Sequence, residues 1–486
     1  MSIVARRLLR ATRSPDAPAM TGVLVPAQSS GYIGNSGRGQ YLWYPIDHPN
    51  PVPDSLGSGV KDVYARVLWR EIESTQRGVY NWAPLDQYRT LAAARGGRFG
   101  FRIMPFHQGI AQSLPDDVIA LASTRWIDID GLSHALPDWN DQAYIDRWQE
   151  IMQAAAARYN DDPYCYSVDV GAYGNWGEGH NWPYEDQYPG PNGQTEATVA
   201  TLQQYIRIAA DAFTNTWVYY NPFQAKQDDT YSGRISAEVM QYALDYSDMI
   251  APRTDAFGGG NVQWTTNDIM STAQAAAAAN SVPLNNQPFG RWRIAPVTAE
   301  WPGTISPGGN DGSFAEGVQQ VGDWHISLVS NANYFDDDNG YTSYSPSEQA
   351  AFDSVMIQAG FTYRVTHATC SWTNSRLTAA VTWTNTGVSP TYDVWQVQYQ
   401  LRDVNDTVIA TIQSPLDLRN IRTSDDSLVD TVDIMAASPL TGTETLHTRV
   451  IDPSGTLEPM LLGFGTRASD GAHRIGQLSD NTPLPG

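Results

Sequence analysis

Two glutamates stand where acid–base chemistry is expected. Glu178 closes the stretch 164–178, which begins as an alternating β-branched and aromatic run and turns glycine-rich, and Glu300 ends the run 294–300. Such runs predict buried strands, and parallel barrels carry their chemistry at the C-terminal ends of strands. A carboxyl pair there can cleave a glycosidic bond, one group acting as acid and the other as nucleophile or base. We therefore expect both side chains to face one cleft.

Aromatic side chains accompany both glutamates. Tyr173 and Trp176 precede Glu178, and Trp301 follows Glu300 directly. Ring faces of this kind pack on the CH groups of sugars, whereas core packing is the alternative for each ring. A solvated loop carboxylate is the alternative for Glu178. Burial among glycines and aromatics is expected to raise the pKa of Glu178, while Glu300 needs hydrogen bonds or a cation to stay ionised.

Other polar and aromatic side chains lie at or near the ends of predicted strands. Arg66 is expected inside the barrel, where it would keep Glu300 ionised, with an ordinary ion pair as the alternative. Asp255 is the best placed to bind two sugar hydroxyls. The remaining candidates for substrate binding are Trp69, His107, Asn175 and Asn221.

Strand-like and helix-like segments alternate through the first two thirds of the chain. The predicted strands are 39–44, 61–72, 98–106, 164–170, 217–221, 249–255, 294–300 and 328–335. The predicted helices are 84–94, 143–159, 196–213, 235–244, 268–279, 314–326 and 346–359. Eight strands with intervening helices predict an α/β fold, a (β/α)8 TIM barrel. A doubly wound sheet would need a glycine-rich phosphate loop after an early strand, and the sequence has none.

The pattern changes after residue 362. Short segments with period-two alternation, at 377–383, 395–401, 408–412 and 446–450, are separated by turn residues. Strands without helices predict a C-terminal antiparallel β-sandwich. We therefore expect an N-terminal arm at 1–35, a barrel at 36–362 and a β-sandwich at 363–486.

Composition excludes several classes of partner. The formal net charge of −22 argues against nucleic acid and anionic membrane surfaces.

No apolar run has the length of a transmembrane helix, and the arginine-containing N-terminus has no signal-peptide core. Cys165 and Cys370 show no disulfide or metal spacing. With no nucleotide loop or metal motif, we expect no cofactor.

Two groups of motifs resemble known glycoside hydrolase-like proteins. The segments 66–73, 78–82 and 85–86 resemble the second strand and following helix of clan A glycoside hydrolases, including β-galactosidases. The segments 35–39, 176–178 and 253–257 resemble uncharacterised β-galactosidase-like barrel proteins with a β-sandwich tail. This resemblance implies that Glu178 is the acid/base and Glu300 the nucleophile. The clan has an asparagine directly before the acid/base, whereas here Gly177 holds that position and Asn175 lies two residues earlier.

Two functions remain open from the sequence. The first is a retaining glycoside hydrolase that acts on a polysaccharide or oligosaccharide through Glu178 and Glu300. The second is a non-catalytic or weakly active glycan-binding protein, for example a phage tail or other virion component that recognises envelope carbohydrate. In that case the N-terminal arm would dock to the particle or mediate a homo-oligomer. The location, whether extracellular, virion-associated or cytoplasmic, is left open.

Overall fold

The computed structural model describes most of the chain. It covers residues 19–43, 59–129, 131–181, 193–221, 230–255, 266–301, 313–330 and 344–480, with 183, 184, 186, 188, 190, 257, 258 and 341. The expected N-terminal arm falls largely on residues 1–18, which lie outside this part of the chain.

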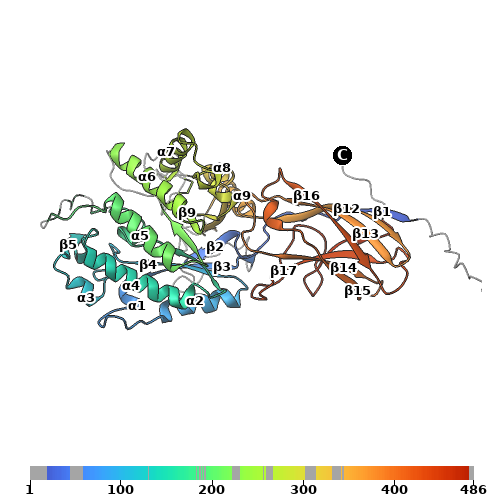
Figure 1. Ribbon diagram of the computed structural model, residues 1–486, viewed down its shortest axis with the longest axis horizontal. Coiled ribbons are helices and arrows are strands. Elements are labelled where there is room, and N and C mark those ends of the chain that lie inside the picture. Colours follow the sequence, from blue (N-terminus) through green and yellow to red (C-terminus); the bar gives the residue numbers. More distant parts are fainter. Residues whose placement is uncertain are drawn as a thin grey trace, which may run out of the picture.

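Eight parallel strands close into a barrel, which confirms the predicted fold class (Figure 1). They are β2 (Gly39–Trp43), β3 (Asp62–Leu68), β4 (Phe99–Met104), β7 (Cys165–Asp169), β8 (Trp217–Tyr220), β9 (Ile250–Thr254), β10 (Val297–Ala299) and β11 (Ile326–Ser330). The pairing runs in chain order and closes where β11 pairs β2 and β10. Each strand therefore delivers its C-terminal end to the same rim.

Helices cover the outside of the barrel. They are α1 (Trp69–Ile72), α2 (Ala83–Ala94), α3 (Asp116–Ile119), α4 (Gln142–Tyr159), α5 (Val199–Ala212), α6 (Thr230–Tyr246), α7 (Thr266–Ala279), α8 (Phe314–Asp323) and α9 (Pro346–Gln358). A hairpin of β5 (Arg125–Ile129) and β6 (Leu132–Leu136) is inserted between β4 and α4. The expected strand 61–72 ends at Leu68, because the chain turns there into α1.

Period-two alternation sorts the barrel side chains into two environments. On β3, Val63, Ala65 and Val67 pack in the large core between strands and helices, whereas Tyr64 belongs to a separate aromatic cluster with residues of β2 and β7. Arg66 shares the face of Tyr64 and is buried. The interior of this barrel is therefore lined by tyrosine and charged side chains, which need partners there.

Two antiparallel sheets form the C-terminal sandwich. One has the order β1 (Met20–Leu24), β12 (Tyr363–Thr373), β13 (Arg376–Asn385) and β16 (Ser427–Met435). The other has the order β15 (Val408–Gln413), β14 (Gln396–Arg402), β17 (Thr445–Ile451) and β18 (His473–Gln477). β1 pairs β12 from Met20 to Leu24. Residues 20–24, which were expected in the N-terminal arm or extended approach, are thus an edge strand of the sandwich.

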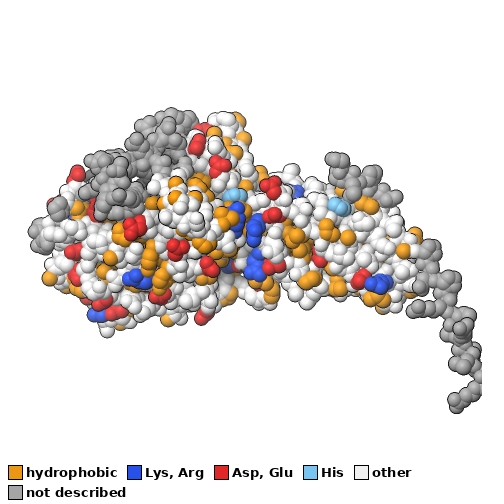
Figure 2. Space-filling model, turned by 45° about the horizontal axis from the view of Figure 1, so that its top comes forward, with side chains coloured by type: hydrophobic (Ala, Val, Ile, Leu, Met, Phe, Trp, Pro, Cys, Tyr) orange, Lys and Arg blue, Asp and Glu red, His pale blue; other side chains and the backbone are white. Residues whose placement is uncertain are grey.

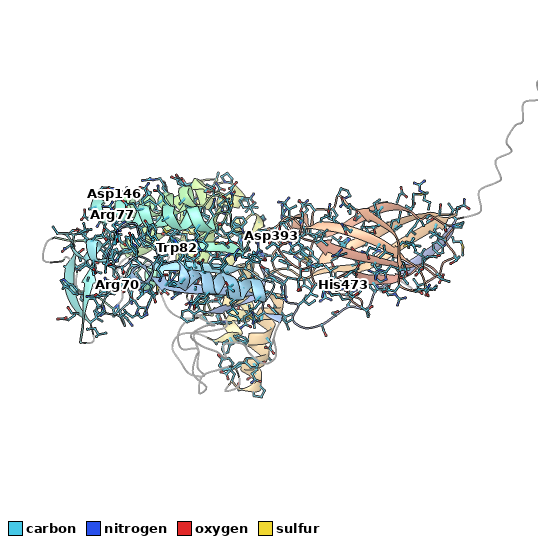
Figure 3. The ribbon with its side chains drawn as sticks, turned by 90° about the horizontal axis from the view of Figure 1, so that it is seen from below. Arg70, Arg77, Trp82, Asp146, Asp393 and His473 are labelled. Atoms are coloured by element: carbon cyan, nitrogen blue, oxygen red, sulfur yellow. The ribbon has the colours of Figure 1, made fainter. Side chains whose placement is uncertain are left out.

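The sandwich adjoins the barrel, and side chains join the two (Figure 3). Arg98 at the start of β4 bonds Asp393 through Nη1 at 2.9 Å and Nη2 at 2.6 Å. The Tyr392 hydroxyl donates to the carbonyl of Trp292 at 2.6 Å. In Figure 2 basic side chains gather at this junction, while acidic side chains are spread over the visible face. The sandwich therefore lies away from the C-terminal rim of the barrel strands.

Candidate functional site

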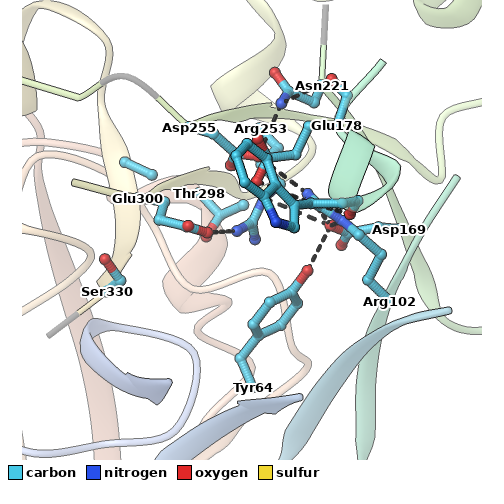
Figure 4. A network of polar contacts seen from close by, with 12 residues as sticks. Tyr64, Arg102, Asp169, Glu178, Asn221, Arg253, Asp255, Thr298, Glu300 and Ser330 are labelled. Atoms are coloured by element: carbon cyan, nitrogen blue, oxygen red, sulfur yellow. Dashed lines mark hydrogen bonds and ion pairs between the residues drawn. The ribbon is translucent and has the colours of Figure 1, made fainter. Parts of the chain in front are cut away.

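Seven charged side chains meet at the C-terminal rim of the barrel (Figure 4). Six of them come from β3, β4, β7, β9 and β10 or from the residue just after the strand, and Glu178 comes from the loop after β7, directly behind the 3-10 turn Asn175–Gly177. They are Arg66, Arg102, Asp169, Glu178, Arg253, Asp255 and Glu300. Backbone bonds fix the strand ends that carry two of them, since the Glu300 amide donates to the Thr254 carbonyl at 2.7 Å. The rim therefore brings together the two proposed catalytic glutamates, Arg66 and Asp255.

One guanidinium joins the two glutamates. Arg66 Nη1 lies 2.6 Å from Glu178 Oε1, and Arg66 Nη2 lies 2.6 Å from Glu300 Oε2. The guanidinium fork is rigid and small, so these two carboxylate oxygens lie within about 7 Å of each other. The Arg66 side chain is 4% exposed, Glu178 12% and Glu300 3%. Of the two carboxylates, Glu178 is thus the one nearer to solvent.

Asp255 is held by two arginines and an amide. Its Oδ1 lies 2.6 Å from Arg253 Nε, and its Oδ2 accepts from Arg102 Nη2 at 3.2 Å and Asn221 Nδ2 at 2.9 Å. Burial opposes the charge of Asp255, but Arg253, Arg102 and Arg66 together hold its pKa well below the usual range. Asp255 and Asn221 therefore orient the arginines and each other. A sugar hydroxyl would have to share the side-chain oxygens of Asp255 and the amide of Asn221 with their present partners.

The charges of the cluster do not cancel. Three arginines, 66, 102 and 253, face four carboxylates, 169, 178, 255 and 300. Burying an unbalanced charge is costly, so the cluster favours one bound proton. Burial, with Asp255 and Glu178 adding to it against Arg66 and Arg253, raises the pKa of Glu300 to about 7. Glu300 is thus the group that favours this proton.

Glu178 shifts in the opposite direction. Burial raises the pKa of Glu178. Arg66, Arg102 and a hydrogen bond with His180 lower it by a larger amount, so the pKa of Glu178 lies below its usual range. His180 Nε2 is 3.1 Å from Glu178 Oε2. The expectation that Glu178 is protonated while Glu300 is ionised is therefore wrong for the resting protein. Neighbouring cations outweigh the desolvation on which that expectation depended.

The backbone before Glu178 explains its departure from the clan pattern. Gly177 has φ +69°, and a Cβ there would lie 2.7 Å from the Gly171 carbonyl oxygen. Only glycine fits this approach without a backbone shift. Asn175 is fully buried, and its side chain pairs with the backbone amide and side chain of Gln108. In this structure Asn175 holds the segment after β4 against the Glu178 loop.

The aromatic candidates separate into two groups. Trp176 is partly exposed and has φ +55°. Its ring makes T-shaped contacts with His107 and His180, with ring centroids 6.3 Å and 5.8 Å apart. Tyr173 is buried and its hydroxyl accepts from Asn181 Nδ2 at 2.6 Å. A strained aromatic beside a candidate catalytic carboxylate is typical of a functional position. Trp176 is therefore the ring best placed to meet a ligand.

Trp69 and Trp301 do not offer a ring face to the site. Both are 0% exposed. Trp69 donates to Glu73 Oε2 at 3.0 Å and packs on Trp148, with ring centroids 5.3 Å apart. Trp301 packs on Phe257, with ring centroids 4.5 Å apart. The expectation that these two residues bind substrate is corrected: both are core residues, because Trp69 packs on Trp148 of α4 and Trp301 packs on Phe314 of α8 and Phe352 of α9.

A small cavity lies beside Glu178. It has a volume of about 30 Å³, and its lining includes Arg102, Asp169, Tyr173, Glu178 and Asn221. This volume suits water and is too small for a sugar ring. The cavity can therefore hold water beside Glu178, and a sugar has to approach this carboxylate from its exposed side.

The sequence reading missed two arginines and an aspartate. Arg102, Arg253 and Asp169 are each buried within a strand, at 0%, 1% and 3% exposure. The available signal was a charged residue inside an apolar strand, because such a residue needs a buried partner. Among the described residues, no group of three His, Cys, Asp or Glu side chains is placed to hold a metal. No described helix is long and apolar enough to cross a membrane.

Comparisons with known proteins give structural likenesses only. No protein-family model matches the chain, and no curated protein matches it. An endo-glycoceramidase II from Rhodococcus sp. is 14% identical, with 84% of this chain and 100% of that chain covered, at a TM-score of 0.40. A glucosidase from Croceicoccus marinus is 10% identical, with 86% of this chain and 100% of that chain covered, at a TM-score of 0.36. A β-amylase catalytic domain from Paenibacillus polymyxa is 9% identical, with 66% of this chain and 98% of that chain covered, at a TM-score of 0.40. At these values the likenesses add no argument about activity.

Proposed function

We propose that this protein is a glycoside hydrolase of the retaining type, with Glu178 as acid/base and Glu300 as nucleophile. The observation that carries this proposal is the pairing of both carboxylates with one guanidinium, Arg66, at the C-terminal rim of a parallel barrel. Retaining enzymes hold their two carboxyl groups about 5–5.5 Å apart, and inverting ones about 6.5–9.5 Å. The separation of at most about 7 Å that Arg66 imposes includes the retaining range and excludes most of the inverting range.

The proton count of the cluster suits this chemistry. Glycoside hydrolysis needs one protonated and one ionised carboxyl group, and the excess of one carboxylate over the arginines supplies one shared proton. In the resting protein this proton favours Glu300, whose pKa is raised to about 7. The reaction uses the form in which Glu178 holds the proton. That form is a minority, which slows turnover without preventing it.

The substrate side of the proposal follows from position. Glu178 is the more exposed of the two glutamates, and Trp176 lies partly exposed two residues before it. We assign Glu178 to the leaving oxygen and Trp176 to a sugar face. Every arginine of the cluster already faces a carboxylate, so an anionic sugar gains no free cation there. We therefore propose a neutral glycoside as substrate.

One observation favours the alternative, a glycan-binding protein without turnover. Glu300 is 3% exposed, and its Oε2 bonds both Arg66 and Arg253. A nucleophile held in this way has to exchange an ion pair before it attacks a sugar carbon. The virion role and docking through the N-terminal arm, whose residues 1–18 lie outside the described chain, stay predictions.

A chromogenic glycoside screen tests the proposal. Turnover of 4-nitrophenyl glycosides is measured for the wild type and for Glu178→Ala and Glu300→Ala, with product anomers followed by NMR. We expect Glu300→Ala to lose turnover, and azide to restore part of it as a glycosyl azide. Glu178→Ala should slow poor leaving groups more than good ones.

The matched control is Glu238→Gln, which changes an exposed glutamate of α6. It should keep wild-type rates. Wild-type rates in both active-site variants would disprove the carboxylate pair. Glycan binding without any cleavage across the panel would establish the alternative.

A further inference from the structure

A groove lies on the sandwich, remote from the barrel rim. It has a volume of about 600 Å³ and is walled by the turn at 403–406, by β17 and β18, and by the loop at 466–468. Ligand pockets for small molecules span about 300–1,000 Å³. The groove is therefore large enough for a ligand of one or two sugar rings.

The walls of the groove are fixed by hydrogen bonds. The Ala468 amide donates to the Ala472 carbonyl at 2.7 Å, and the Arg474 amide to the Thr466 carbonyl at 3.0 Å. Within the same loop, Asp470 accepts from Arg402 Nη2 at 2.8 Å. This loop is thereby tied to the outer face of β14 and β18. A groove built from fixed walls loses little conformational entropy on binding.

A buried histidine lines the groove with an unused nitrogen. His447 is 5% exposed, and its Nε2 pairs with Thr445 Oγ1 at 3.0 Å. Its Nδ1 is buried and has no hydrogen-bond partner among the described residues. Burial, together with nearby Arg402, lowers the pKa of His447 to about 4, so the ring is neutral at pH 7. Because Nδ1 is itself buried, the ring acts on the groove through Nε2, which holds the Thr445 hydroxyl in the wall.

The charges of the groove balance. Asp403 and Asp406 stand against Arg467 and Arg474 in the lining. Both aspartates are already engaged: Asp406 lies 3.2 Å from Arg402 Nη1, and Asp403 accepts backbone amides of its own turn. Arg402 also pairs with Asp470, so three aspartates (403, 406 and 470) and three arginines (402, 467 and 474) surround the groove, and it carries no net formal charge.

We propose that this groove is a second binding site, for a neutral saccharide of one or two rings. Hydroxyl groups of a sugar donate and accept at once, which matches the hydroxyls of Thr445 and Thr466 and the guanidinium of Arg474, with His447 Nε2 holding the Thr445 hydroxyl in place. Val404, which is 72% exposed at the rim, offers an apolar contact to ring CH groups. The proposal stands whether or not the barrel hydrolyses glycosides.

Titration calorimetry of the full chain tests this site. The probes are cellobiose, maltose, lactose and N,N′-diacetylchitobiose, with glucuronate and inorganic phosphate as charged comparisons. We expect at least one neutral disaccharide to bind. Its affinity should fall tenfold or more in Arg474→Ala, an exposed position, and in His447→Phe, which keeps the ring but removes both nitrogens.

The matched control is Arg376→Ala, an exposed arginine on the other sheet of the sandwich. It should bind the disaccharide as the wild type does. Equal affinity in Arg474→Ala and the wild type would place the sugar elsewhere and overturn the site. Binding of phosphate or glucuronate alone, or of no probe, would overturn the ligand class. Thermal melting of His447→Phe separates loss of binding from loss of folding.

Discussion

Glu178 and Glu300 bond the two ends of the same guanidinium, that of Arg66, with both contacts at 2.6 Å. The two carboxyl groups are therefore one titrating unit. Their protons leave in two steps that belong to the pair.

The first prediction concerns the pH dependence of kcat/KM. The pair should be active while it holds one proton. Activity should fall as pH rises through about 7, the pKa of Glu300, because the last proton then leaves. It should also fall at acid pH below the usual glutamate range, where Glu178 takes a second proton. A rate that keeps rising above pH 8 would contradict the shared proton.

The second prediction concerns Arg66. Arg66→Met leaves both glutamates buried beside each other without their common cation, so the upper pKa of the rate profile should move upward. Removing one partner of a buried pair costs about 3–5 kcal/mol of stability, to be checked by urea unfolding. Arg376→Ala, which breaks the exposed pair with Asp433, should leave the urea midpoint nearly unchanged, because water screens an exposed pair.

The third prediction is a pH-dependent stability difference. The pKa of Glu300 rises from 4.5 when unfolded to about 7 when folded, so its contribution to stability is fully present below pH 4.5 and is lost as pH rises to 7. Glu300→Gln cannot ionise. Relative to the wild type, this variant should therefore gain up to about 3 kcal/mol between pH 4 and pH 8. Parallel curves for the two proteins would mean that the pKa of Glu300 does not change on folding.

The fourth prediction concerns the loop before Glu178. Gly177→Ala adds a Cβ 2.7 Å from the Gly171 carbonyl oxygen, at a positive φ. We expect a loss of more than about 2 kcal/mol and reduced activity, since the loop has to move. Gly455→Ala has a similar φ, +74°, with no atom within 4 Å of the added Cβ. It should show only the backbone cost of about 1 kcal/mol.

The fifth prediction separates the two tryptophans. Trp176→Ala should weaken glycan binding and leave the melting temperature nearly unchanged, because its ring is partly exposed. Trp301→Ala should lower stability by about 3–5 kcal/mol, because it empties a core site among Phe257 and Phe314. Binding assays and thermal melts distinguish the two, and equal binding in Trp176→Ala would make this ring a packing residue only.

The sequence by itself determined the fold class. Period-two alternation and helical periodicity are local properties, and they predicted the eight barrel strands and the sandwich strands after residue 362. They also placed Glu178, Asp255 and Glu300 at strand ends. Strand β1 was missed, because a five-residue edge strand shows little alternation and pairs with β12, which lies far away in the chain.

Only the tertiary structure decided how the site is charged. The pKa values of Glu178 and Glu300 depend on distances to Arg66, Arg102 and Arg253, which come from different strands. Local composition around Glu178 indicated desolvation, but the sign of the shift follows from the cations around it. Likewise, the short helix after Leu68 turns Trp69 into the core. Coulomb energies and burial arise from spatial neighbours, and strand periodicity does not specify which charges become neighbours.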